Sequence, residues 1–258
     1  MQPVLAFDIE TIPDVAGLIR LHGLPADSPH EEVVEMALLA RRQATGSDFM
    51  PHHLQRVVAI SCALLIEDKF KVWTLGRENE DERTILQRFF EGIERYTPQL
   101  VSWNGGGFDL PVLNHRALIH GVVATRYWEW GEEDRDFRYN NYLNRYHTRH
   151  LDLMDVLAMY SGRANAPLDG MAQLCGLPGK LGMDGSQVWA AYHDGRLSEI
   201  CDYCETDVLN TFLLFLRFEH MRGALGSEAH VAEINRVRGF LGQSGAAHWQ
   251  QFLALWQA

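Results

Sequence analysis

A short apolar run near the N-terminus ends in two acids, which limits where this segment can lie in a folded protein. Residues 3–9 are apolar except for Asp8, and Glu10 follows directly. The run predicts a buried strand, in which Asp8 and Glu10 point to the same face because side chains alternate. Two neighbouring carboxylates repel each other unless a cation lies between them. The pattern therefore favours a functional site, with an exposed pair at a strand end as the alternative.

The remaining pattern predicts an α/β fold, in which helices flank a mixed β-sheet. Residues 57–67 and 70–75 are rich in β-forming side chains and predict a hairpin. Ser28, Pro29 and Glu31 predict a helix start with a capping box. Strands are predicted over 3–9, 57–67, 70–75, 99–103 and 150–153, and helices over 29–43, 80–96, 109–120, 153–160, 168–175, 186–192, 197–221, 227–238 and 245–256.

A second acid follows a glycine-rich turn. Asn104 and three glycines separate a predicted strand from a predicted helix, which begins at Asp109. Glycine permits a close approach of the backbone to a ligand, although three glycines also suit a tight turn. Asp109 is therefore a candidate site residue, and capping of its own helix is the alternative.

A third segment places a tyrosine and an acid on one helix. Tyr203 and Asp207 are four residues apart, so they share a face of the helix. A buried aspartate is unfavourable unless it is paired or bound to metal, whereas a solvated face is the alternative. Cys201 and Cys204 form a single CxxC pair without a second pair or a nearby histidine, so we expect no zinc site.

Composition narrows the classes of protein that fit. The 258 residues suffice for one sizeable core, and the net charge of −11 counts against a large surface that wraps duplex nucleic acid. The acidic balance is compatible with a cleft of carboxylates, because bound divalent cations offset their charge. No signal peptide or membrane span is expected, and four cysteines do not suggest a disulfide framework. We therefore expect a cytoplasmic protein that does not bind membranes.

The three segments together suit metal-dependent phosphoryl chemistry. Carboxylates from separate elements can hold two Mg²⁺ or Mn²⁺ ions, which are also coordinated by substrate phosphate oxygens. Such a pair of ions stabilises both the attacking and the leaving oxygen in an in-line displacement. A nearby tyrosine hydroxyl can orient the attacking water.

The segments FDIET, WNGGGFD and YCETD resemble the three exonuclease motifs of the DEDD superfamily. The chain is most similar to the proofreading exonuclease domain of family-B DNA polymerases, and more narrowly to stand-alone bacterial exonucleases related to that domain. That family also shares a GLPGK stretch, here residues 176–180, and a DGSQVW stretch, here residues 184–189. The branch that uses histidine places it where Asp202 stands, so the tyrosine branch is implied. Trp103 departs from the usual Tyr or Phe.

The resemblance implies a ribonuclease H-like fold over residues 1–220, followed by a C-terminal helical extension over 221–258. It implies metal binding by four acids, and a tyrosine that orients or helps deprotonate the attacking water. The implied metal ligands are Asp8, Glu10, Asp109 and Asp207, and the implied tyrosine is Tyr203. Lys180 is a candidate phosphate contact, and a solvated lysine is the alternative. Thr11, Asn104 and Phe108 are candidate substrate contacts. The alternatives are a role in the turn for Asn104 and packing for Thr11 and Phe108.

The resemblance predicts a 3′–5′ exonuclease that acts on single-stranded DNA and releases nucleoside 5′-monophosphates. A 3′–5′ exoribonuclease is an alternative, because the sequence does not show whether a 2′-hydroxyl is required. A catalytically silent nucleic-acid-binding module is another, since fold does not settle function. The complete set of four acids and a tyrosine favours an enzyme.

One further segment has a composition that suits single-stranded nucleic acid. Residues 127–149 combine aromatic side chains with arginines, a mixture that can stack bases and contact phosphates. The same segment contains five acids, which oppose phosphate binding. We expect it to be a folded insertion that packs on the domain, and a nucleic-acid platform is the alternative.

Overall fold

A mixed five-stranded sheet forms the centre of the protein, which we describe from a computed structural model that covers residues 2–257. The strand order is β3-β2-β1-β4-β5. Neighbouring strands β1, β2 and β3 are antiparallel, whereas β1–β4 and β4–β5 are parallel. The strands are β1 (Val4–Pro13), β2 (Gln55–Ile66), β3 (Lys69–Leu75), β4 (Gln99–Ser102) and β5 (His150–Asp152). The predicted fold class and hairpin are confirmed.

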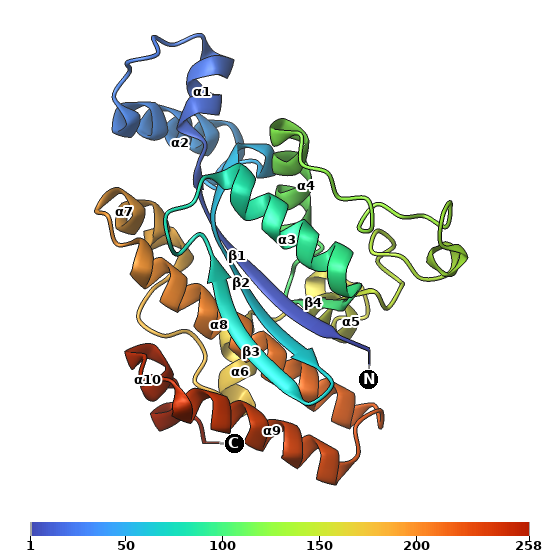
Figure 1. Cartoon of the computed structure of the whole chain (residues 1–258). Helices are drawn as coiled ribbons and strands as arrows, with labels where there is room; N and C mark the ends of the chain where they lie inside the picture. The colour runs from blue at the N-terminus through green and yellow to red at the C-terminus, as the bar shows by residue number, and fades with distance from the viewer. Residues whose placement is uncertain (1, 258) are drawn as a thin grey trace.

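Alternation along β1 builds two hydrophobic cores. Leu5 and Phe7 pack on one side of the sheet, against α3 (Glu82–Tyr96) and α4 (Asp109–His120). Val4 and Ala6 face the other side, where α8 (Leu197–Met221) covers the sheet. Figure 1 shows α3 and α8 on opposite sides of the long strands. Burial on both faces explains why the strand is apolar almost throughout.

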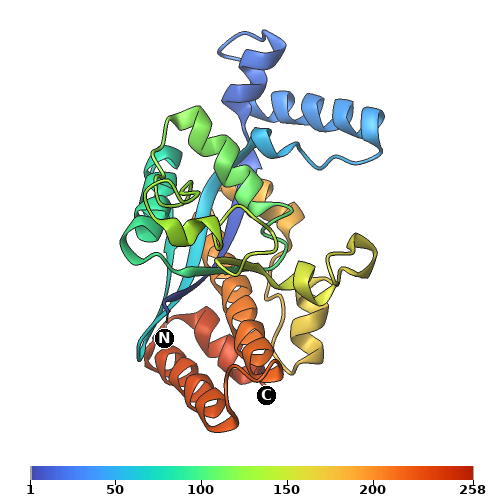
Figure 2. The same ribbon diagram turned by 90° about the vertical axis from the view of Figure 1, so that its right-hand side faces the viewer.

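A helical insertion, residues 14–54, separates β1 from β2. It contains α1 (Val15–His22), α2 (His30–Thr45) and the short 3₁₀ helix η1 (His52–Leu54). The two helices enclose a small core of their own around Leu18 and Val33. In Figure 2 the light-blue helix α2 projects away from the sheet. The insertion is therefore a separate layer that is attached beside the end of β1.

A buried ion network fixes this insertion to the sheet. The guanidinium of Arg116 on α4 bonds both Glu82 at 2.8 Å and Asp14 at 2.5 Å. Asp14 also accepts the amide of Gly17 and so caps α1. Glu82 accepts the amide of Val57 at 2.7 Å. These contacts join the entry of the insertion to α3, α4 and β2.

Several predicted boundaries were wrong at the insertion. Helix α1 was not predicted, and β1 continues to Pro13 instead of ending at Ile9. The capping box at Ser28 is absent: Pro29 holds the cap position without a side-chain bond, and the Ser28 hydroxyl donates to Pro25 O. The Ser28 hydroxyl is therefore used in a local turn with Pro25 and does not cap the helix.

The remaining helices follow β5 and cover the α8 side of the sheet. They include α5 (Leu153–Leu157), α6 (Leu168–Leu174), α7 (Val188–His193), α9 (Ser227–Gln243) and α10 (Ala247–Leu255), with 3₁₀ turns η3 (Gly162–Ala164) and η4 (Gly185–Gln187). The 3₁₀ turn η2 (Arg135–Arg138) lies earlier in the chain, between α4 and β5. Trp249 and Phe252 of α10 share one core with Phe212 of α8. Within residues 2–257, no helix is long and apolar enough to cross a membrane.

The aromatic segment 127–149 packs on the domain as an irregular insertion. Phe137 is buried, and the guanidinium groups of Arg126 and Arg149 lie 4.3 Å and 3.8 Å from its ring centroid. Tyr127 and Tyr142 are also buried and stack on each other. The arginines and aromatic rings thus stabilise the segment itself, which supports the packing interpretation.

Candidate active site

The two acids of β1 lie side by side on the face that α8 covers. Carboxylate oxygens of Asp8 and Glu10 and the Cys204 sulfur lie within 4.8 Å of one another. The pairing of β1 with β2 shifts its register between Glu10 and Thr11. Such a bulge increases local twist and often redirects side chains beside active sites. The predicted common face of Asp8 and Glu10 is therefore confirmed.

The glycine-rich turn is held by an acid on the next strand. Asp152 of β5 accepts the amides of Asn104 and Gly106, both at 2.9 Å, and also caps α5 through the amide of Asp155. Asn104 has a left-handed backbone, with φ of 67°, a conformation that asparagine tolerates better than most residues. The turn leads the chain from β4 into α4 and so places Asp109 beside β1.

Asp109 joins α4 to the first strand. It is 4% exposed, and its Oδ1 accepts the amide of Ile9 at 3.2 Å, between the two acids of β1 in the sequence. The cap position of α4 belongs to Phe108, whose side chain makes no capping bond. Capping of its own helix is therefore not the role of Asp109, and the carboxylate instead reaches the strand end that carries Asp8 and Glu10.

Helix α8 brings Tyr203 and Asp207 to the same place. Both side chains are buried, and Asp207 Oδ1 has no hydrogen-bond partner among the described residues. Burial, followed by the negative charges of Asp207, Glu10 and Asp8, raises the pKa of Tyr203 far above its ordinary value. The Tyr203 hydroxyl thus lies beside three acids and keeps its proton.

Mutual repulsion and burial act together on the four acids. Burial raises the pKa of Asp8 and Glu10 well above the ordinary range, and the neighbouring carboxylates raise both further. Burial likewise raises the pKa of Asp109 to about 7 and that of Asp207 to about 6, although the positive charge of Lys180 opposes the latter shift. Such a cluster is unfavourable without cations, and hard cations prefer carboxylate oxygens. The donor set therefore fits divalent metal ions.

Cys204 supports this cluster from α8. Its thiol donates weak hydrogen bonds to the backbone oxygen and the carboxylate of Asp8, at 3.5 Å and 3.6 Å. Burial and the nearby acids raise the pKa of Cys204 well above its ordinary value, so it remains a thiol. Cys201 is a free buried cysteine as well. This environment does not favour the thiolate ligands of a zinc site.

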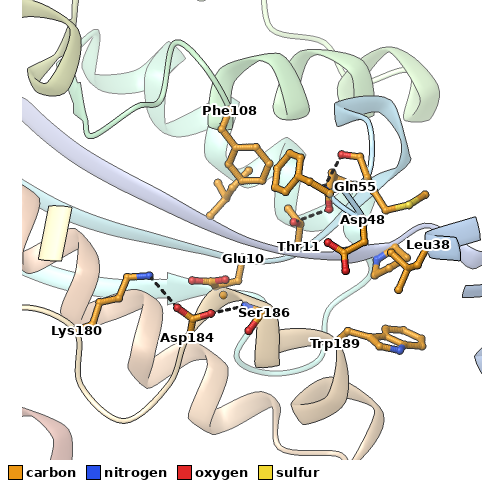
Figure 3. A pocket seen from close by; sticks show the side chains of 15 residues that line it. Glu10, Thr11, Leu38, Asp48, Gln55, Phe108, Lys180, Asp184, Ser186 and Trp189 are labelled. Atoms are coloured by element: carbon orange, nitrogen blue, oxygen red, sulfur yellow. Dashed lines mark hydrogen bonds and ion pairs between the residues drawn. The ribbon is translucent and has the colours of Figure 1, made fainter. Parts of the chain in front are cut away.

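A cleft of about 480 Å³ opens beside these acids. Figure 3 shows Glu10 and Thr11 at its centre, with Phe108 and Trp189 on opposite sides of that strand segment. Three of the predicted substrate contacts line this cleft, namely Thr11, Phe108 and Lys180. Asn104 is not among its described lining residues, and its carbonyl instead accepts the amides of Gly107 and Phe108 within the turn.

Lys180 reaches the cleft from a turn that α6 and α8 hold in place. Its amide donates to Asp169 at 2.8 Å, and Asn210 donates to the preceding Gly179 oxygen at 2.9 Å. The Lys180 ammonium lies 5.5 Å from the centroid of the Tyr203 ring and 3.9 Å from Asp184. A positive charge is thus held at the lining of the cleft, beside Tyr203 and Asp184.

Two contributors to this site were not predicted as site residues. Asp184 forms a capping box with Gln187 and so fixes the turn that borders the cleft at Ser186. Phe49, from the helical insertion, also lines the cleft, although its own segment was predicted only as a loop. The spacing of Asp184 and Gln187 suits a capping box and was recognisable, whereas the position of Phe49 depends on how the insertion folds back.

The sheet order, its flanking helices and the acids gathered from β1, α4 and α8 define a protein with the ribonuclease H-like fold of exonuclease domains. Residues 47–256 match the family described as "Predicted 3'-5' exonuclease related to the exonuclease domain of PolB", and the chain belongs to this family. The match includes Asp109, Tyr203 and Asp207 but begins after Asp8 and Glu10.

Curated relatives include the catalytic subunits of DNA polymerase epsilon from several organisms. The chain is 27% identical over 145 residues to the Aspergillus fumigatus protein, a match that covers 54% of this chain and 6% of that protein. The corresponding protein of Saccharomyces cerevisiae is 25% identical over 153 residues, 57% of this chain and 6% of that protein. The similarity therefore concerns a small part of each polymerase.

Proposed function

We propose that this protein is a two-metal-ion 3′–5′ exonuclease that hydrolyses single-stranded DNA from its 3′ end and releases nucleoside 5′-monophosphates. The observation that carries the proposal is the convergence of four acids from three elements beside an open cleft, of which Glu10, Asp109 and Asp207 are buried and Asp8 is half-buried. Asp8, Glu10, Asp109 and Asp207 are the proposed ligands of Mg²⁺ or Mn²⁺. Their raised pKa values and the unpartnered Asp207 Oδ1 support a site that requires cations.

The metals would lower the pKa of a bound water and would stabilise negative charge on phosphate oxygens. Tyr203 keeps its proton, so its role in this proposal is to donate a hydrogen bond that orients the attacking water. Deprotonation of that water by Tyr203 is not part of the proposal. The proposal therefore includes membership of the tyrosine branch of the superfamily.

The cleft residues would position the end of the strand. Lys180 lies close enough to Tyr203 to contact the scissile phosphate, while Thr11 and Phe108 line the space where the terminal nucleotide would lie. The Thr11 hydroxyl donates to Gln55 at 2.9 Å, which fixes its oxygen as an acceptor towards the cleft. Asn104 contributes through the turn that carries Asp109.

DNA is the proposed substrate because the matched relatives are DNA polymerases. The test uses 5′-labelled single-stranded DNA and RNA of matched sequence, incubated with Mg²⁺ or Mn²⁺ and resolved on a gel. We expect a ladder that shortens from the 3′ end, faster on DNA, and that disappears with EDTA or in Asp8→Ala. Faster shortening of RNA would reassign the substrate, and intact strands in every metal would contradict the exonuclease.

A further inference from the structure

The helical insertion supplies an exposed aromatic side chain to the mouth of the cleft. Phe49 is 54% exposed and lines the same cleft as Glu10 and Lys180. Single exposed apolar side chains are common on proteins, so the exposure of Phe49 is informative because its ring borders a cleft. Its position in the lining of this cleft indicates that the Phe49 ring contacts the substrate. The family match begins at residue 47, so it includes Phe49 but not residues 14–46 of the insertion.

Phe49 extends an aromatic row that starts at the acids. Phe108 directly precedes Asp109, and the Phe49 ring lies 5.6 Å from the Phe108 ring between centroids. His52 of η1 completes the group, 5.8 Å from Phe108 and 6.5 Å from Phe49. Phe49 therefore extends the aromatic surface that begins with Phe108, the residue next to Asp109 in the chain.

Hydrogen bonds hold the loop that presents this ring. Arg41 of α2 donates to the Phe49 carbonyl at 3.2 Å, and the Phe49 amide donates to the Ser47 hydroxyl at 3.2 Å. Arg42 bonds the neighbouring Asp48 carboxylate at 2.6 Å. The exposed ring is thus carried by an ordered turn, which reduces the entropy lost when a ligand binds.

The opposite wall of the cleft also carries an aromatic side chain. Trp189 of α7 lines the cleft across the strand from Phe108, and Leu38 of α2 lies beside it (Figure 3). The cleft volume of about 480 Å³ falls in the range of small-molecule sites. The space between the two walls therefore suits one or two unpaired nucleotides of a strand. Aromatic walls accept any base, because every base presents a flat π face.

We propose that Phe49, together with Phe108 and with Trp189 across the cleft, forms a base-stacking platform for the last unpaired nucleotides of a single strand. The ligand class is single-stranded nucleic acid, which enters past the insertion before its 3′ end reaches the acids. Phe49 stacks a base upstream of the terminal nucleotide, because Phe108 adjoins Asp109 in the chain and Phe49 contacts the ring of Phe108. The direction of the strand in this inference rests on the proposed function. The stacking itself does not depend on that function.

The test compares Phe49→Ala with wild type on oligothymidylate in steady-state kinetics. We expect KM to rise about 5- to 150-fold, the range for loss of one base–aromatic stack, while kcat changes little. Phe49→Trp should restore KM. Tyr139→Ala is the matched control, because Tyr139 is an aromatic residue that is 82% exposed and is not a described lining residue of the cleft.

Substrates with one abasic nucleotide locate the stacked base. An abasic residue at the second or third position from the 3′ end should raise KM for wild type and add little in Phe49→Ala, since both changes remove the same contact. Equal KM values for Phe49→Ala, Tyr139→Ala and wild type would overturn the platform.

Binding separates this inference from the proposed function. If wild type cleaves no strand in Mg²⁺ or Mn²⁺, the exonuclease proposal fails, and fluorescence anisotropy with labelled oligothymidylate then tests the platform alone. Weaker binding by Phe49→Ala than by Tyr139→Ala would support the platform, and equal binding would overturn it. Thermal midpoints equal to that of wild type would show that an exposed side chain was removed without loss of folding.

Discussion

Helix α8 carries acids on two faces, and the two faces have opposite electrostatic environments. Asp207 lies with the three other carboxylates of the candidate site, and one of its oxygens has no partner among residues 2–257. Glu205, two positions earlier, bonds His248 at 2.8 Å, Thr74 at 2.8 Å and Arg77 at 3.0 Å. Both side chains are buried, but only Glu205 is surrounded by donors and positive charge.

The pKa values record this difference. Burial raises the pKa of Asp207 to about 6, and the positive charge of Lys180 only partly opposes the shift. Burial also acts to raise the pKa of Glu205, but the hydrogen bond from His248 and the charge of Arg77 outweigh it and lower the value. A buried acid with its own partners stabilises the fold, whereas a buried acid without them is a candidate ligand.

The same contrast favours a structural role for a second group of possible metal ligands, Asp202, Glu205 and His248. Asp202, Glu205 and His248 lie close enough to share an ion. The Arg77 guanidinium already contacts Asp202 at 2.8 Å and Glu205 at 3.0 Å, and so provides the compensating charge. This network fixes α10 of the C-terminal segment against α8, which is a structural role.

The largest expected effect is on activity at the face that lacks partners. Asp207→Asn should lower kcat by about 10²–10³-fold or more. The reason is that it removes a proposed ligand of the cations that would stabilise negative charge in the transition state. Glu205→Gln is the matched control, since it also removes one charge from α8, and should retain activity within a few-fold. Rates of 3′-end shortening on single-stranded DNA measure both. Equal losses in the two variants would erase the proposed distinction between the faces.

A smaller effect is expected on stability, and on the other face. Glu205→Gln should lower the free energy of unfolding by about 1–3 kcal/mol, less than for a fully buried pair, because Arg77 is partly exposed. In a chain of this size that corresponds to a thermal midpoint lower by about 2–10 °C. Metal-free Asp207→Asn should be as stable as wild type or more so. Calorimetry of both variants in EDTA measures these changes in stability. A larger loss of stability in Asp207→Asn than in Glu205→Gln would count against the cation site.

The smallest expected effect is a difference in pH dependence. The raised pKa values of Asp109, about 7, and Asp207, about 6, mean that the folded protein keeps protons that the unfolded chain releases above about pH 4. Their contribution to the stability of the metal-free protein should therefore fall as pH rises from about 4 to 7. The lowered pKa of Glu205 gives a contribution that is complete above its ordinary pKa and is lost only in stronger acid.

Thermal midpoints in EDTA at pH 5, 6, 7 and 8 measure this difference. The gap between Asp207→Asn and wild type should widen in favour of the variant as pH rises, while the deficit of Glu205→Gln stays constant. Added Mn²⁺ should raise the wild-type midpoint at pH 8 and should have less effect on Asp207→Asn. A gap that is independent of pH would show that the acids do not repel one another in the folded protein.

Much of the fold was predictable because its pattern is local. The β2–β3 hairpin follows from two β-rich runs separated by a short polar turn, and α8 occupies the predicted residues Leu197–Met221. The insertion was predicted less well. Helix α1 has only eight residues, begins directly after β1 and was missed despite its cap at Asp14. The hydroxyl of Ser28 bonds a local turn that competes with the helix cap.

The sequence by itself determined the chemistry of the candidate site. The alternation of β1 puts Asp8 and Glu10 on one face, and helical spacing puts Tyr203 and Asp207 on another, because both periodicities are fixed by backbone geometry. It also identified the aromatic segment 127–149, whose arginines and rings pack on one another.

Only the tertiary structure decided which acids lack partners and which aromatic side chain meets the cleft. Asp207 and Glu205 are two residues apart, yet their environments come from β1 in one case and from β3 and α10 in the other. Phe49 reaches the cleft because Arg41 and Arg42 hold its loop beside the strand end. Burial, charge and contact depend on segments far apart in the chain, which no local pattern specifies.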